Sequence, residues 1–191
     1  MNMQNILVIG CSPRQKGNSD KAAEIVVQTL ADRGESCDLI FLRDKSIIPC
    51  QGCRGCLKTT DNRCVLADRD DVQEILLAIN SAGKVYFCSP VYFYHVPAVF
   101  KALIDRGQSF YEAWMQKGAP EKALMRAFCV LVAGRRKGEL LFKGSLISLK
   151  YFLQPFGYAL EDLCLRGLDQ KNDLTTDPES RELVKRFIEK S

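Results

Sequence analysis

The sequence predicts one α/β domain in which helices cover both faces of a parallel β-sheet. Apolar runs typical of buried strands alternate with amphipathic helical patterns, and this alternation occurs five times. No internal repeat, low-complexity tract or linker divides the 191 residues. A chain of this length buries a core without help from disulfides or metal. We therefore expect residues 1–191 to form a single domain.

Five apolar runs have the composition of buried strands, and five amphipathic patterns follow them. The strands are expected at residues 6–9, 37–42, 85–88, 128–132 and, less clearly, 158–165. The helices are expected at residues 19–34, 72–79, 97–107 and beyond, 139–156 and 178–190.

Local signals mark the ends of several helices. Ser19 is expected to cap the first helix and Gly34 to end it. Asp70 and Asp71 precede the second helix, where negative charge favours a helix start. Proline at residue 178 suits the first turn of the last helix.

The composition of the chain indicates in which compartment the protein is expected and which classes of partner are not expected. The charged share of 26% suits a globular protein, and a net charge of +4 is too small to predict a nucleic-acid partner. Residues 1–5 lack the features of an export signal, and the weakly charged stretch 85–100 is too short to span a membrane. The nine cysteines are therefore expected to be thiols, metal ligands or catalytic groups in the cytoplasm, rather than a disulfide scaffold.

The first strand-to-helix loop, residues 10–19, has the features of a phosphate site. In open parallel sheets, ligands bind where the strands end, and a helix N-terminus there offers free N–H groups and partial positive charge. Neutral donors and Arg14 add to these, although the loop matches neither G-x-G-x-x-G nor the P-loop. The alternative is an ordinary polar loop with Gly17 as a turn residue and Ser19 as a helix cap.

The motif S-P-R-Q-K-G-N-S at residues 12–19 resembles the FMN-phosphate loop of the NADPH-dependent FMN reductase family. Residues 89–93 and 97–106 are similar to the segment that borders the isoalloxazine ring in that family. The resemblance covers most of residues 5–106. It implies a flavodoxin-like three-layer sandwich with a five-stranded parallel sheet in the order 2-1-3-4-5. It also implies FMN as cofactor, with NAD(P)H as a co-substrate in some relatives.

Two later loops are expected to border the ring. Prolines at both ends stiffen residues 89–97, whose backbone N–H groups suit the polar edge of a flavin and whose aromatics suit a ring face or, alternatively, a subunit interface. Gly134 would let the backbone approach the flavin. The basic residues 135–137 either attract an acidic redox partner or a nucleotide phosphate, or are plain solvated surface. The residues expected to hold FMN are Ser12, Arg14, Gly17, Asn18, Ser19, Pro90, Val91, Tyr92, Phe93 and Gly134.

No catalytic residue is assigned from the sequence. His95, the only histidine, lies in the second of these loops. It either donates a hydrogen bond or supplies a proton to the reduced ring, or it is a surface or packing residue.

A cysteine-rich loop at about residues 44–69 predicts an iron–sulfur site. Cys50, Cys53 and Cys56 have the spacing of ferredoxin-type runs, and Cys64 follows after seven residues. Structural zinc sites usually combine separated cysteine pairs or include histidine, so a 4Fe–4S cluster fits better. The last spacing is longer than in bacterial ferredoxins, and no proline follows Cys64. The remaining five cysteines, in or beside strands, are expected to be buried and inert.

A compact cysteine motif at this place resembles the iron–sulfur flavoproteins, in which a 4Fe–4S cluster neighbours FMN and ferredoxin-like proteins donate electrons. Other relatives with such loops are NAD(P)H-dependent oxidoreductases with bare thiols. Three functions thus stay open: an FMN-dependent electron-transfer protein with a cluster, an NAD(P)H-dependent FMN or quinone reductase without one, and a non-enzymatic FMN- or metal-binding module.

The expected partners are a small-molecule or protein redox partner and further copies of the chain, as a homodimer or homotetramer. Aromatics at Phe110, Tyr111 and Trp114 suit such an interface. A cluster far from its own flavin would pass electrons between subunits.

Overall fold

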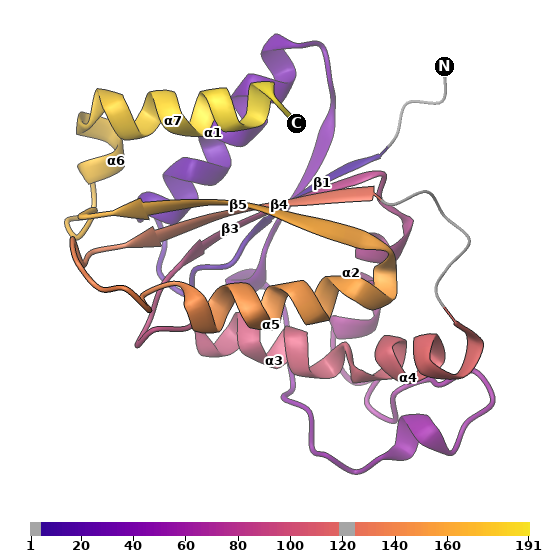
Figure 1. The fold of residues 1–191 in the computed structure, drawn as a ribbon. Coiled ribbons are helices and arrows are strands. Elements are labelled where there is room, and N and C mark those ends of the chain that lie inside the picture. The colour runs from indigo at the N-terminus through magenta and orange to yellow at the C-terminus, as the bar shows by residue number, and fades with distance from the viewer. Residues whose placement is uncertain (1–4, 119–124) are drawn as a thin grey trace.

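A parallel sheet of five strands organises the protein (Figure 1). The computed structural model describes residues 5–118 and 125–191. Residues 1–4, part of the segment for which no export signal is predicted, lie outside the described residues. The strand order is β2-β1-β3-β4-β5, so the predicted fold class and order are confirmed. The strands are β1 Ile6–Gly10, β2 Cys37–Phe41, β3 Lys84–Pro90, β4 Met125–Ala133 and β5 Tyr158–Arg166.

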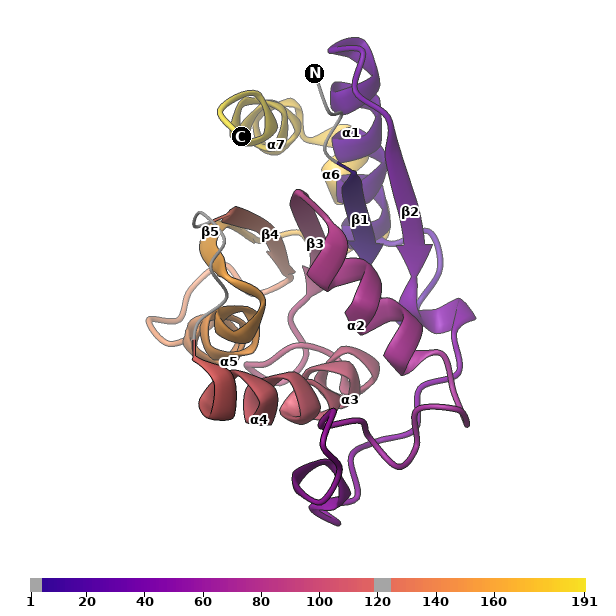
Figure 2. The ribbon, with the colours of Figure 1, turned by 90° about the vertical axis from the view of Figure 1, so that its right-hand side faces the viewer.

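Helices cover both faces of the sheet (Figures 1 and 2). One face carries α1 Asn18–Asp32, α6 Asp173–Thr176 and α7 Pro178–Glu189. The other carries α2 Val72–Ser81, α3 Ala98–Arg106, α4 Gln108–Lys117 and α5 Lys143–Leu153. Short 3₁₀ turns lie at Leu42–Asp44, Gly55–Leu57 and Gln154–Phe156.

Successive side chains of each central strand enter two different cores. Leu7 and Ile9 of β1 pack into the core with α2, α3 and α5, whereas Ile6 and Val8 pack into the core with α1 and α7. A strand buried on both faces must be apolar at every position, which is why these runs lack the alternation of a one-sided strand. The continuous apolar runs in the sequence have this cause.

The register brings the carboxyl ends of the strands to one edge. Gly10 of β1 pairs with Phe41 and Cys88, and Ala133 of β4 pairs with Arg166. The loops that follow β1, β3, β4 and β5 therefore meet at this edge, at the left of Figure 1.

Several helix ends differ from the sequence-based predictions. Helix α1 begins at Asn18 with Gly17 as its capping residue, so the prediction of Ser19 as N-cap is wrong. Gly17 has the extended backbone of a capping residue, with φ −90° and ψ −179°, and the helix therefore begins at the next residue, Asn18. Helix α5 begins at Lys143 rather than at residue 139, because residues 139–142 form turns that lead into it. The short α6 was not predicted.

No described helix is both long enough and apolar enough to cross a membrane.

Candidate functional site

A pocket of about 240 Å³ lies at the carboxyl edge of the sheet, and we call it the edge pocket. Nine of the ten residues expected to hold FMN line it, and they come from three loops far apart in the sequence. The residues that line the pocket are Ser12, Arg14, Gly17, Asn18, Ser19, Pro90, Val91, Tyr92, Gly134, Val132, Leu168 and Asp169.

The loop between β1 and α1 is held in shape by its own side chains. The Ser12 hydroxyl donates to the carbonyl oxygen of Arg14 at 2.9 Å and accepts from the Arg14 N–H at 3.1 Å. The Lys16 N–H donates to Oδ2 of Asp20 at 2.7 Å, which supports a left-handed Lys16 with φ +56°. Arg43 donates to the other oxygen of Asp20 at 2.9 Å. The carboxylate beneath the loop is therefore paired.

The N-terminus of α1 faces the edge pocket with unused backbone donors. Its first intrahelical bond runs from the Lys21 N–H to the carbonyl oxygen of Gly17 at 3.0 Å, so the helix itself does not use the N–H groups of the three preceding residues. Two of these, Asn18 and Ser19, line the pocket. Arg14, exposed at the rim, adds a positive charge. This set of groups is suited to an anion.

The side chain of Asn18 has a different role from the one predicted. Both hydrogens of its amide are used, in bonds to the carbonyl oxygens of Leu168 at 3.1 Å and Gln170 at 2.8 Å. Its oxygen accepts from the Leu174 N–H at 3.0 Å. The prediction that this amide is a free donor to a ligand is wrong, because the amide holds the loop after β5 against α1.

The second loop makes a two-residue turn that directs Phe93 away from the pocket. Tyr92 and His95 exchange backbone hydrogen bonds of 2.8 and 3.0 Å, and the residues between them have φ of +48° and +64°. Phe93 is 100% exposed and does not line the edge pocket, so its expected contact with the flavin stays a prediction. A turn with two left-handed residues places the first side chain outward, and the sequence contains no glycine that would have indicated it.

His95 connects this turn to helix α5. Its Nε2 lies 2.9 Å from the Ser148 hydroxyl, and its Cδ2 lies next to Gly144, where an added Cβ would come within 3.2 Å. His95 does not line the edge pocket. Of the two roles considered for it, packing is the one supported by these contacts.

Gly134 and Asp169 form one wall of the edge pocket. A Cβ at Gly134 would overlap the carboxylate of Asp169. The sequence indicated Gly134 but not Asp169, whose only signal was its place just after the fifth strand. In the basic run beyond Gly134, Arg135 contacts the second loop, where it donates to the Tyr94 hydroxyl at 2.9 Å. Arg135 therefore already makes a side-chain hydrogen bond within its own chain.

A second, larger cavity of about 420 Å³ lies beneath helices α3 and α4, and we call it the cysteine cavity. All four cysteines of the predicted cluster site, Cys50, Cys53, Cys56 and Cys64, line it. Leu57 and Leu66 of the same loop also line it, and Arg106 of α3 and Gln108, Ser109 and Glu112 of α4 line it from the helices. The loop that carries the cysteines lies below these helices in Figure 2.

The four thiols share the cavity without forming a ready metal site. Cys50 and Cys53 are exposed, and burial together with the nearby Glu112 carboxylate raises the pKa of Cys56. Within residues 5–118 and 125–191, no three His, Cys, Asp or Glu side chains lie close enough together to bind one metal ion.

The remaining five cysteines divide into two groups. Cys11, Cys88 and Cys129 are fully buried, and burial raises the pKa of each well above its ordinary value, as expected for inert thiols. Cys37 and Cys164 are only partly buried, so the expectation of full burial is wrong for these two. Burial and the adjacent Asp162 raise the pKa of Cys164 to about 12.

Comparison with solved structures supports the fold. An FMN-dependent NADH-azoreductase from Bacillus anthracis, solved with FMN, superposes with a TM-score of 0.73 at 14% identity, over 97% of this chain and 98% of that chain. An NAD(P)H:quinone oxidoreductase from Methanothermobacter marburgensis gives a TM-score of 0.68 at 16% identity, over 98% and 96% of the two chains.

Curated relatives match about half of the chain. An iron-sulfur flavoprotein of Methanocaldococcus jannaschii is 35% identical over 103 residues, which cover 54% of this chain and 51% of that protein. One from Methanosarcina thermophila is 32% identical over 98 residues, 51% of this chain and 49% of that protein. The chain spans about half the length of the curated relatives it matches. The family model for NADPH-dependent FMN reductase matches residues 4–151, and the chain therefore belongs to this family.

Proposed function

We propose that this protein is an FMN-dependent oxidoreductase that holds FMN in the edge pocket and a 4Fe–4S cluster in the cysteine cavity. The observation that carries the proposal is the convergence of three separate loops on the edge pocket, with nine of the ten residues selected from the sequence. FMN supplies two-electron chemistry when bound, and a cluster supplies one-electron chemistry.

The start of α1 would hold the phosphate of FMN. Backbone N–H groups of Asn18 and Ser19 are unused by the helix, and Arg14 supplies charge at the rim. The pocket volume of about 240 Å³ is below the roughly 300–1,000 Å³ of small-molecule sites, so it suits part of a mononucleotide rather than all of it. We expect it to enclose the phosphate and the chain attached to it, with the ring partly outside.

The ring would lie against the second loop and Gly134. The Val91 N–H is bonded to the carbonyl oxygen of Val132 at 2.8 Å, which fixes the start of this loop on β4. Tyr92 lines the pocket and offers an aromatic surface, and the absence of a side chain at Gly134 leaves room for close approach.

Both the side chains that line the cysteine cavity and the backbone between the cysteines suit a cluster. Four thiols from one short loop face one cavity, and thiolates are the usual ligands of iron–sulfur clusters. Gly52 and Arg54 have left-handed backbones, with φ of +63° and +56°, which turn the chain tightly between cysteines. Since the thiols are not gathered, loading with iron and sulfide must draw them together.

A second candidate is an NAD(P)H-dependent reductase of flavins or quinones that carries no cluster. The observation in its favour is that no three of the described side chains that bind metals are close enough to ligate one ion. The cysteines would then be free thiols, in keeping with a cytoplasmic protein.

The edge pocket and the cysteine cavity share no lining residue. The loop that leads into α3 bounds the first, and Arg106 at the end of α3 bounds the second, so a helix about 13 Å long separates them.

We propose that the working form is a homodimer or homotetramer in which electrons also pass between subunits. A monomer that transfers electrons at the full rate would contradict this.

Anaerobic purification with flavin and iron counted per chain separates these functions. We expect one FMN and about four irons per chain, with broad absorption beside the flavin bands. We also expect a ferredoxin-type donor to reduce the protein. Rapid NAD(P)H oxidation without iron would favour the second candidate, and flavin binding without any turnover would favour a binding module.

Matched cysteine variants test the ligands. Cys53→Ala should lose most of the iron and keep FMN. The control, Cys37→Ala, removes a partly buried thiol from β2, away from the cavity, and should keep both. Full iron retention in Cys53→Ala would remove the proposed ligation.

A further inference from the structure

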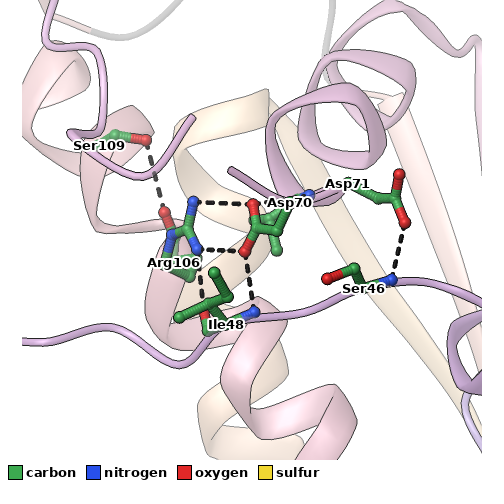
Figure 3. Close-up of polar contacts among 7 residues, drawn as sticks. Ser46, Ile48, Asp70, Asp71, Arg106 and Ser109 are labelled. Carbon is green, nitrogen blue, oxygen red and sulfur yellow. Dashed lines mark hydrogen bonds and ion pairs between the residues drawn. The ribbon is translucent and has the colours of Figure 1, made fainter. Parts of the chain in front are cut away.

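A buried ion pair at the end of α3 borders the cysteine cavity. The side chains of Arg106 and Asp70 are 1% and 0% exposed. Nη1 of Arg106 lies 2.6 Å from Oδ2 of Asp70, and Nη2 lies 3.2 Å from Oδ1, so the contact is bidentate (Figure 3).

The same pair holds the cysteine loop. Nη1 of Arg106 donates to the carbonyl oxygen of Ile48 at 2.8 Å, and Oδ2 of Asp70 accepts from the Ile48 N–H at 2.8 Å. Ile48 lies two residues before Cys50, and Asp70 follows the loop, so both ends of the loop are tied to Arg106 (Figure 3). The guanidinium therefore has a fixed position relative to the loop.

One donor of this guanidinium is unused. Nε of Arg106 is buried and has no hydrogen-bond partner in the part of the chain that the structure describes. Leaving a buried donor without a partner destabilises the folded state. Arg106 also lines the cysteine cavity, together with the four cysteines. A negatively charged acceptor in the cavity would remove this cost.

We propose that Arg106 donates its Nε–H to a sulfur atom of the cluster held in the cysteine cavity and thereby raises the reduction potential of the cluster. The inference rests on the proposed cluster. Reduction adds one electron and increases the negative charge on the sulfurs, so a hydrogen bond to sulfur favours the reduced state. Arg106 keeps its proton throughout, since arginine is not deprotonated in proteins, and no other atom moves in this step.

Arg106→Lys is the direct test. Lysine keeps the positive charge near Asp70 and removes the Nε donor. In a redox titration of the anaerobic protein followed by electron paramagnetic resonance, the midpoint potential should shift to a more negative value while the iron count stays the same. An unchanged potential with full iron would overturn the role of Arg106.

Two other arginines provide matched controls. Arg43 also has a buried Nε without a partner among the described residues and pairs with a carboxylate, but it does not line the cavity. Arg54 lines the cavity from an exposed position. Arg43→Lys and Arg54→Lys should both leave the midpoint potential unchanged, and an equal shift in either would contradict the proposal.

A measurement on the unaltered chain covers the case in which Arg106→Lys does not fold. In protein labelled with ¹⁵N-arginine, pulsed magnetic resonance of the reduced cluster should detect a ¹⁵N coupling, and this coupling should persist in Arg54→Lys. Its absence from the wild type would overturn the inference. A wild-type protein that contains no iron would overturn the proposed cluster itself, and this result is seen before any variant is made.

Discussion

The side-chain amide of Asn18 donates a hydrogen bond to the carbonyl oxygen of Leu168 at 3.1 Å and thereby joins the start of α1 to the loop after β5. Asn18 is 5% exposed and makes two further bonds, to the carbonyl oxygen of Gln170 and from the Leu174 N–H. These contacts place Asp169 at the edge pocket. One residue of the motif at residues 12–19 thus positions a segment 150 residues away in the sequence.

Asn18→Ala should destabilise the protein and weaken flavin binding together. Three hydrogen bonds disappear and the buried Leu174 N–H loses its acceptor, so we expect a loss of about 2–4 kcal/mol in the free energy of unfolding. Urea denaturation measures this loss. Gln28→Ala, which removes an exposed amide bonded to Asp32 on the same helix, is the control and should cost less than about 0.5 kcal/mol. Equal effects of the two substitutions would contradict the structural role of Asn18.

Gly134→Ala should reduce FMN affinity by about tenfold, which corresponds to about 1.4 kcal/mol. The added Cβ overlaps the Asp169 carboxylate, which must move along the pocket wall. Fluorescence titration with FMN measures the change. In the double variant Gly134→Ala/Asp169→Ala the overlap with the carboxylate is gone and only a 3.1 Å contact with the Cβ of residue 169 remains, so affinity should return close to that of Asp169→Ala alone. Additive losses would show that the overlap is not the cause.

Asp70→Asn should change how stability depends on pH. Burial alone would raise the pKa of Asp70, but hydrogen bonds from Arg106, Ile48 and Val72 and the charge of Arg106 outweigh it and lower the pKa. A lowered pKa in the folded state adds stability above the unfolded value of about 3.9, and this stability is lost as pH falls through the folded pKa.

Urea midpoints at pH 7, 5 and 3 measure this effect. The variant should be less stable by about 3–5 kcal/mol at pH 7, because it leaves the Arg106 charge buried and unpaired. Its deficit should begin to shrink as pH falls below about 3.9, because the unfolded wild-type chain then takes up a proton on Asp70 before the folded state does. A deficit that stays constant with pH would contradict this account.

Thiol alkylation should divide the cysteines by location. In the iron-free protein at pH 8, iodoacetamide should label Cys50 and Cys53 first, because they are exposed. Cys11, Cys88 and Cys129 should react only after unfolding, since burial excludes the reagent and raises their pKa values. Mass spectrometry counts the labels, and cluster loading should protect all four cavity thiols. Labelling of Cys129 in the native state would contradict the burial.

The pattern of apolar residues and the positions of the loops were sufficient to predict the sheet and most of the residues that line the edge pocket. Continuous apolar runs indicate strands buried on both faces, and parallel strands must end at one edge, so residues such as Ser12, Pro90 and Gly134 could be placed together before the structure was known. The four cavity cysteines were identified by their spacing alone.

The features that the sequence did not indicate depend on tertiary contacts. Asp169 enters the site because Asn18 holds its loop, and Phe93 leaves it because the turn at residues 93–94 adopts left-handed angles without glycine. The pairing of Arg106 with Asp70 joins residues 36 positions apart, and neither shows its partner in the local pattern. Such contacts follow from the packed fold rather than from propensity.

Titration of flavin-free protein with FMN and with riboflavin tests the central claim most directly. The account predicts one FMN per chain, with riboflavin at least about tenfold weaker because it lacks the phosphate that the start of α1 and Arg14 would bind. Arg14→Ala should weaken the binding of FMN but not of riboflavin, so the difference in affinity between the two flavins should become smaller. Failure of the wild-type protein to take up FMN at millimolar concentration, or equal affinity for the two flavins, would contradict the account.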